Sequence, residues 1–220
     1  MQVSVFCDVT DPWSYVGVTR LHRGAAVFTL MTGEPVVVSL RAHLLAPDEV
    51  SDARPLLEAK ADELGGLDRA HTFFEQVTAA AKITGIELNL ADAVRASSFD
   101  AWRLLTWAEE QGPGIQQDLA QQLWRGHFLE GADIGDPMAL ASRAALVGLD
   151  LETADAILAG DAYADVVRTQ HETAEALHVT QHPFVVAESR WTLAGPQSQD
   201  DYVQGLQQMY AQWRDELGPA

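Results

Sequence analysis

Alternating apolar and polar residues open the chain, and segments of helical periodicity follow them. Residues 2–8 (QVSVFCD) place apolar side chains on one side of an extended segment, which predicts a short strand. Residues 35–45 (PVVVSLRAHLL) contain a continuous apolar run, which is typical of a strand buried on both faces. A helix is expected between them, over residues 13 to 31. The two strands should therefore be parallel and joined by a right-handed crossover.

The rest of the chain completes a recognisable order of elements. Residues 51–160 contain helix-period segments separated by GG, QGPG and GADIGDP. After a further long helix, TQHPFVVAESRWTLAG predicts two strands with a tight turn at residues 187–189, and a helix closes the chain. This order predicts an α/β protein: a thioredoxin fold with a large all-helical insertion. We expect residues 1–50 and 161–220 to form a discontinuous thioredoxin-like domain around the insertion at 51–160.

Charge and composition exclude several classes of partner. The 220 residues include 14 Lys and Arg against 32 Asp and Glu, a formal net charge of −18. Such a surface repels phosphate backbones and anionic lipid heads, so neither nucleic acid nor a membrane surface is an expected partner. The N-terminal MQVSVFCDVT has no targeting pattern and no apolar run reaches a membrane span of about 18 residues, which predicts a cytoplasmic protein. A homodimer is left open.

Cysteine and histidine usage narrows the chemistry further. Cys7 is the only cysteine, so an intramolecular disulfide and a multi-cysteine metal site are both excluded. On its strand, Cys7 is interpreted as a small buried apolar residue. The histidines show no spacing to one another or to carboxylates that argues for a metal ligand set, so no metal site is predicted.

Three segments carry a resemblance to a known family. CDVTDPWSYVG resembles the D-x-x-C-P-W-C-Y-x-G opening of DsbA-like proteins of the FrnE type. LWRGHFLEGADIGDPMAL is similar to a helix connection in that family's insertion, and HVTQHPFVV followed by AGPQ looks like its cis-proline and G-A-Q signatures. The same superfamily includes 2-hydroxychromene-2-carboxylate isomerase and kappa-class glutathione transferase. The resemblance implies a thioredoxin fold and membership of an oxidoreductase family.

The same resemblance places two non-cysteine residues at the redox motif. Asp11 stands where the family has its first cysteine and Ser14 where it has the second, so disulfide exchange is excluded. Pro183 resembles the family's cis-proline, whose loop faces the start of the first helix and would bring His182 to Asp11 and Ser14. These three residues are the candidate catalytic groups, with His182 as acid or base near pH 7, Asp11 orienting it and Ser14 donating to a substrate oxygen.

The local chemistry at Asp11 leads to a further expectation. Asp11 precedes Pro12 in an N-cap pattern, and a carboxylate that accepts the first amides of a helix should become a stronger acid. Its negative charge would repel a second anion such as a thiolate. The alternative interpretation gives Asp11, Ser14 and His182 only structural roles, as an N-cap, a first-turn residue and a surface loop residue.

A pocket between the helical insertion and the thioredoxin half is the expected place for a substrate. The candidate substrate-binding residues are Pro12, Trp13, Trp102 and Pro183. His43, which follows the second strand, is a weaker candidate that faces the cleft from the side.

Three functions are compatible with these residues. The first is acid-base isomerisation or rearrangement of a small aromatic or polyketide-like molecule. The second is a non-catalytic module that binds an extended peptide or a partner, as a chaperone does. The third is an isomerase or transferase that uses glutathione or mycothiol as a thiol cofactor and Ser14 to hold it.

Overall fold

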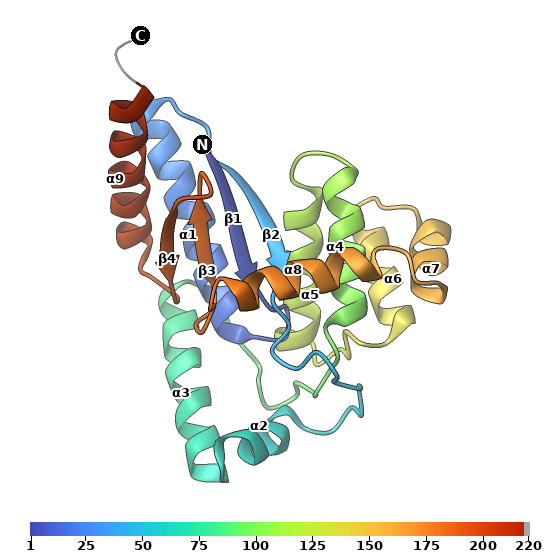
Figure 1. The fold of residues 1–220 in the computed structure, drawn as a ribbon. Helices are drawn as coiled ribbons and strands as arrows, with labels where there is room; N and C mark the ends of the chain where they lie inside the picture. Colours follow the sequence, from blue (N-terminus) through green and yellow to red (C-terminus); the bar gives the residue numbers. More distant parts are fainter. Residues whose placement is uncertain (218–220) are drawn as a thin grey trace.

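Four strands form the central sheet of the computed structural model, which describes residues 1–217 (Figure 1). The strands are β1 (Gln2–Cys7), β2 (Val37–Ala42), β3 (Phe184–Ala187) and β4 (Trp191–Ala194), and their order across the sheet is β2-β1-β3-β4. Strands β1 and β2 are parallel, whereas β3 is antiparallel to both β1 and β4. This mixed sheet is that of a thioredoxin fold, which confirms the predicted fold class.

Helices connect the strands and follow the last of them, in the predicted order (Figure 1). Helix α1 (Pro12–Thr32) connects the two parallel strands, α8 (Ala164–Ala176) precedes β3, and α9 (Gln199–Leu217) ends the described chain. The helices between β2 and α8 are α2 (Leu56–Leu64), α3 (Leu67–Ile83), α4 (Phe99–Glu110), α5 (Ile115–Leu129), α6 (Pro137–Leu146) and α7 (Leu151–Ala159).

The two faces of the sheet bury different side chains. Val5 and Val185 belong to the larger core cluster, which also contains Phe28 of α1 and Leu206 of α9. Phe6, the next residue of β1, points to the opposite face, as the period of two in a strand requires. There it joins a second cluster with Ala174 of α8 and Val179. The sheet is therefore held between α1 and α9 on one side and α8 on the other.

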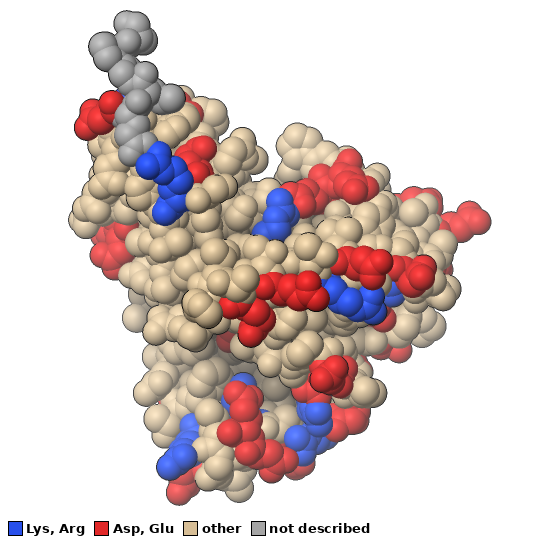
Figure 2. Space-filling view, in the orientation of Figure 1, with Lys and Arg blue, Asp and Glu red and all other residues tan. Residues whose placement is uncertain are grey.

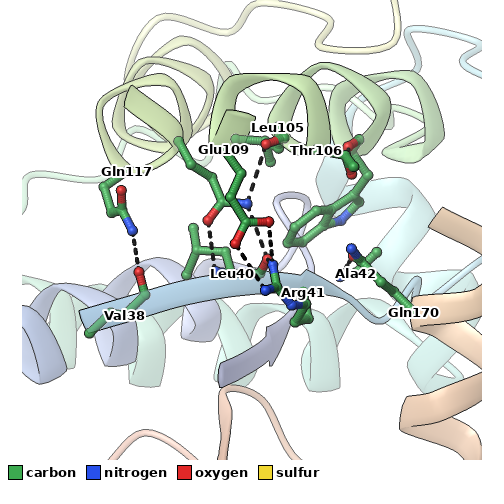
Figure 3. A network of polar contacts seen from close by, with 11 residues as sticks. Val38, Leu40, Arg41, Ala42, Leu105, Thr106, Glu109, Gln117 and Gln170 are labelled. Carbon is green, nitrogen blue, oxygen red and sulfur yellow. Dashed lines mark hydrogen bonds and ion pairs between the residues drawn. The ribbon is translucent and has the colours of Figure 1, made fainter. Parts of the chain in front are cut away.

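Strand β2 lies at one edge of the sheet, and glutamine side chains cover its backbone (Figure 3). Gln116 of α5 accepts a hydrogen bond from the Leu40 amide at 2.8 Å and donates to the carbonyls of Leu40 and Leu105, both at 3.2 Å. Gln117 donates to the Val38 carbonyl, and Gln170 of α8 accepts from the Ala42 amide. These bonds anchor the helical insertion to the edge strand and satisfy backbone groups that would otherwise invite another strand.

Replacing Gln116 by methionine is expected to destabilise the protein by about 1–2 kcal/mol. Gln116 is buried, so the substitution keeps its volume but leaves the Leu40 amide and carbonyl without these partners. Urea unfolding followed by circular dichroism measures the difference. Gln122→Met on the same helix is the control, because its side chain makes none of these bonds. Equal stability of the two variants would contradict a role for Gln116 at the sheet edge.

Acidic side chains are spread across the face of the molecule drawn in Figure 2, with basic side chains between them. Helix α8 alone presents exposed Asp165, Glu172 and Glu175 with a single exposed arginine, Arg168. Within residues 1–217, no helix combines the length and the apolar character that crossing a bilayer requires.

Candidate functional site

Helix α1 begins directly after Asp11, whose carboxylate caps it. The side chain accepts hydrogen bonds from the Trp13 amide at 3.2 Å, from the Ser14 amide at 2.8 Å and from the Ser14 hydroxyl at 2.8 Å. Pro12 occupies the first helical position, where a missing amide hydrogen costs nothing. The predicted N-cap is therefore confirmed, and it places the carboxylate at the carboxyl end of β1.

Two histidines from distant segments lie beside this carboxylate. His43 directly follows β2, and His182 precedes Pro183 in a cis peptide bond just before β3. The Nδ1 atom of His43 lies 2.6 Å from Nε2 of His182, and Nδ1 of His182 lies 3.7 Å from Oδ2 of Asp11. Because β1 and β2 are parallel, the segments that follow them meet at one edge of the sheet, and the loop before β3 joins them there.

A pocket of about 330 Å³ opens at this edge. Its lining residues are Asp11, Trp13, His43, Leu45, Val179, Thr180, Gln181, His182 and Pro196. The lining contains neither lysine nor arginine, and Trp13, Leu45, Val179 and Pro196 make much of it apolar. The pocket therefore offers a carboxyl group and two imidazoles in an otherwise mainly apolar space.

The structure brings six of the seven predicted site residues to one region, but only three of them line the pocket. Asp11, Trp13 and His182 do so. Pro12 and Pro183 are buried next to these residues along the chain. Ser14 is also buried, and its hydroxyl donates to Asp11 and accepts from the Asp8 amide at 3.3 Å, so it is not free to donate to a substrate.

Trp102 lies elsewhere. Its side chain is fully buried in the core on α4, with no exposed surface to offer a ligand. Two further aromatic rings also pack in the core: Tyr15 stacks on Trp124 with ring centroids 5.2 Å apart, and both rings are buried. Trp102 thus belongs to the core face of an amphipathic helix, and Trp13 is the only tryptophan, tyrosine or phenylalanine among the residues that line the pocket.

Burial reverses the expected acidity of Asp11. Removal from water raises the pKa of this carboxyl from its ordinary value of 3.8 to about 6, although the hydrogen bonds from Ser14 and Trp13 act in the opposite direction. The nearby buried Asp8 raises it further. The expectation of a stronger acid was wrong because it counted the capping bonds without the burial. Asp11 instead has a pKa suited to proton transfer near neutral pH.

Burial also changes the expected role of His182. It is buried rather than exposed on a surface loop, and desolvation, together with the neighbouring His43, lowers its pKa to about 3. His182 is therefore a neutral imidazole at physiological pH. The two pKa values favour Asp11 as the group that exchanges protons and His182 as the group that positions or stabilises it, the reverse of the roles expected from sequence.

Cys7 is fully buried on β1. Burial raises the pKa of its thiol well above the ordinary value, and the carboxylates of Asp8 and Asp11 raise it further. A thiolate is the reactive form of cysteine, so this side chain is suited neither to nucleophilic attack nor to disulfide exchange.

We expect the native protein to resist thiol reagents. At pH 7.5, 5,5′-dithiobis(2-nitrobenzoate) should release its chromophore only as fast as the protein unfolds, because the Cys7 thiol is inaccessible and protonated. In urea, one equivalent should be released promptly. Rapid labelling of native protein would place the thiol within reach of the pocket and contradict this description.

Three side chains beside the pocket have the spacing of metal ligands. Candidate ligand atoms of His43, His171 and Glu175 lie within 4.8 Å of one another. Each side chain already takes part in a hydrogen bond: His43 Nε2 with Glu175 Oε1 at 2.8 Å, and His171 Nδ1 with the Leu44 amide at 3.2 Å. Hydrogen bonds to one another and to the backbone therefore hold these side chains in place.

Sequence reasoning undervalued His43 and missed Glu175. The signal for His43 was its place directly after a parallel strand, at the edge where the segment after β1 also ends. The signal for Glu175 was its spacing of four residues from His171, which puts both on one face of α8. No pattern in the sequence pairs Glu175 with His43, because 132 residues separate them.

Comparison with known proteins agrees with this fold. A model of the DSBA-like thioredoxin domain matches residues 2–207. A probable DsbA oxidoreductase from Streptomyces coelicolor is 31% identical, with 96% of this chain and 90% of that chain covered and a TM-score of 0.87. No significant match was found among curated protein sequences.

More distant structures share the fold alone. A 2-hydroxychromene-2-carboxylate isomerase is 15% identical, with 99% of this chain and 98% of that chain covered and a TM-score of 0.62. The cytosolic disulfide reductase DsbM from Pseudomonas aeruginosa, in a structure with glutathione, is 17% identical, with coverage of 96% and 100% and a TM-score of 0.66. With the family model matching almost the whole chain, this protein belongs to the DSBA-like thioredoxin domain family.

Proposed function

We propose that this member of the family transfers protons instead of electrons. In this proposal it acts as an isomerase on a small organic molecule. The observation that carries the proposal is the carboxyl group of Asp11, which has a pKa of about 6 because of its burial and faces a pocket without a thiol. In this proposal the chain is of the FrnE type, and Asp11 and Ser14 occupy the places of the redox cysteines.

The proposed reaction needs no electron acceptor. Above pH 6 the Asp11 carboxylate removes a proton from a carbon next to a substrate carbonyl, and the resulting carboxylic acid returns that proton to a different carbon. Thr180 and Gln181, which line the pocket, carry side-chain donors that can bond to the carbonyl oxygen. One C–H bond breaks and another forms, so atoms and electrons balance within the substrate.

The pocket favours a neutral, planar substrate. Its apolar wall includes the ring of Trp13, which suits an aromatic or polyketide-like molecule. A carboxylate or phosphate on the substrate would meet Asp11 and no lysine or arginine among the lining residues. We therefore propose a substrate without a negative charge. The structurally similar isomerase, in contrast, is named after a carboxylate.

A thiol cofactor is the second candidate, and one observation favours it: glutathione is present in a structure of DsbM, which shares this fold. The Asp11 carboxylate and the engaged hydroxyl of Ser14 argue against a thiolate at the same position. We therefore expect glutathione and mycothiol to leave the melting temperature unchanged.

Thermal-shift screening followed by hydrogen exchange tests the proposal. A ligand at 100 times its Kd adds about 2.7 kcal/mol to stability, so neutral aromatic ketones and phenols that bind are readily detected. Compounds that bind are then incubated in D2O, and NMR or mass spectrometry follows deuterium entering their C–H positions. Proton transfer by Asp11 predicts exchange that Asp11→Asn slows by about 10²–10⁴-fold.

Asp136→Asn provides a matched control. Asp136 also caps a helix ahead of a proline, but it is exposed and lies outside the pocket. Binding without exchange would favour a non-catalytic binding module, and exchange that survives Asp11→Asn would remove Asp11 from the mechanism. Stabilisation by glutathione or mycothiol would support the thiol-dependent reaction instead.

A further inference from the structure

A line of polar contacts leads from the surface of α8 to the pocket. Oε1 of Glu175 lies 2.8 Å from Nε2 of His43, and Nδ1 of His43 lies 2.6 Å from Nε2 of His182. The other ring nitrogen of His182, Nδ1, faces Oδ2 of Asp11 at 3.7 Å. We call Glu175, His43 and His182 the histidine chain. Only Glu175 at its outer end is well exposed, with 63% of its side chain accessible against 8% for His43.

The outer end of the histidine chain determines which ring nitrogens carry its protons. The Glu175 side chain is exposed, so its carboxylate is ionised at pH 8 and has no hydrogen to donate. His43 must therefore carry its ring proton on Nε2. In its neutral form, the His43 ring carries only this one proton, which leaves its Nδ1 as an acceptor. The 2.6 Å contact then requires the proton of His182 to be on Nε2.

The inner end of the histidine chain is His182, which faces Asp11. With its proton on Nε2, His182 presents an unprotonated Nδ1 to the Asp11 carboxyl group. A nitrogen lone pair repels an ionised carboxylate and can accept a hydrogen bond from a protonated one. The opposite tautomer would donate to the carboxylate and stabilise its charge. The tautomer of His182 thus decides which protonation state of Asp11 is favoured.

We propose that Glu175 is a positioning residue that acts through His43 to hold the proton of His182 on Nε2, so that the bare Nδ1 faces Asp11. The effect of Glu175 on catalysis rests on the proposed function, whereas the tautomers of the two histidines do not. Glu175 would set the basicity of a buried group without touching the substrate, as an outer carboxylate does when it orients a histidine.

The residues around His43 hold its ring in a fixed orientation. The ring of His171, one helical turn before Glu175 on α8, stacks on His43 with centroids 5.4 Å apart and planes at 26°. His171 is itself held by the Leu44 amide, which donates to its Nδ1 at 3.2 Å. Ala174, fully buried next to Glu175, fixes this part of α8 to the sheet. The ring of His43 is therefore held by contacts on its face and at both nitrogens.

Nitrogen NMR tests the proposal without a substrate. Long-range ¹H–¹⁵N correlation spectra of chelator-treated protein at pH 8 identify the protonated nitrogen of each histidine, and His182→Gln assigns the His182 signals. We expect wild-type His43 and His182 to carry their protons on Nε2. In Glu175→Lys, the ammonium can only donate to His43, so both protons should move to Nδ1.

Glu172→Lys is the control, because Glu172 is exposed on the same helix and the change of charge is identical. It should keep the wild-type tautomers. A wild-type His182 protonated on Nδ1 would overturn the proposal, and so would a Glu175→Lys spectrum in which the His182 tautomer is unchanged.

The deuterium-exchange assay separates this proposal from the proposed function. If the tautomers are as expected, Glu175→Lys should slow exchange by about tenfold relative to Glu172→Lys. Absence of any exchange in the wild type would reject the proposed function and leave the tautomer result standing. Equal exchange rates in the two variants would reject the positioning role of Glu175 while the function survived.

Discussion

Asp11→Asn is expected to stabilise the folded protein at pH 8 by about 2–3 kcal/mol, even though it removes the group assigned to proton transfer. The pKa of Asp11 rises from 3.8 to about 6 on folding because the carboxyl is buried. The folded state therefore binds this proton more tightly than the unfolded state, and stability falls as the pH rises through this range. Above pH 7 the ionised group costs about 3 kcal/mol, which a neutral asparagine avoids.

The asparagine should keep the helix start intact, since asparagine and aspartate are comparable N-caps. Urea unfolding at pH 8 and pH 5 measures the effect, and the gain at pH 5 should be about half as large because Asp11 is partly protonated there. Asp136→Asn is again the matched control: an exposed N-cap before a proline, expected to change stability little at either pH. An equal gain in stability in both variants, or none in Asp11→Asn, would show that burial does not destabilise the ionised form of this carboxyl group.

Local signals in the sequence were enough to predict the fold. The Asp-Pro pair at residues 11–12 was interpreted as a helix start, and Asp11 caps α1 in the structure. The turn expected at residues 187–189 joins β3 and β4, with positive φ at Glu188 and Ser189. Such features are set by neighbouring residues, so a single sequence displays them directly. The proposed boundaries of the helical insertion remain a prediction.

The chemistry of the site depended on contacts that no local pattern contains. The acidity of Asp11 was predicted with the wrong direction because capping bonds are visible in the sequence and burial beneath a loop 171 residues away is not. His182 was expected near Asp11 from the family resemblance, and it does lie there. Its partner His43 and the outer carboxylate Glu175 come from two further segments, and only the folded chain brings them together.

Gly17→Ala is expected to destabilise the protein by about 2–3 kcal/mol and to displace the loop that carries His182. A methyl group at position 17 of α1 would lie 2.4 Å from Cδ and 2.6 Å from Cγ of Pro183. The ring of Pro183 is rigid and buried, so relief requires the helix or the loop to move. Because Pro183 follows His182 directly, that movement would separate His182 from Asp11 or His43.

Urea unfolding and the histidine NMR signals measure the two effects of this substitution. Gly126→Ala is the control, as Gly126 is also a buried helical glycine, but its added methyl would meet only the flexible end of Arg143 at 2.9 Å. That side chain can move at little cost, and alanine favours a helix by about 0.5–1 kcal/mol over glycine, so the control should be nearly neutral. If Gly17→Ala were equally neutral and left the His182 signals in place, the close packing of α1 against the Pro183 loop would not be what positions His182.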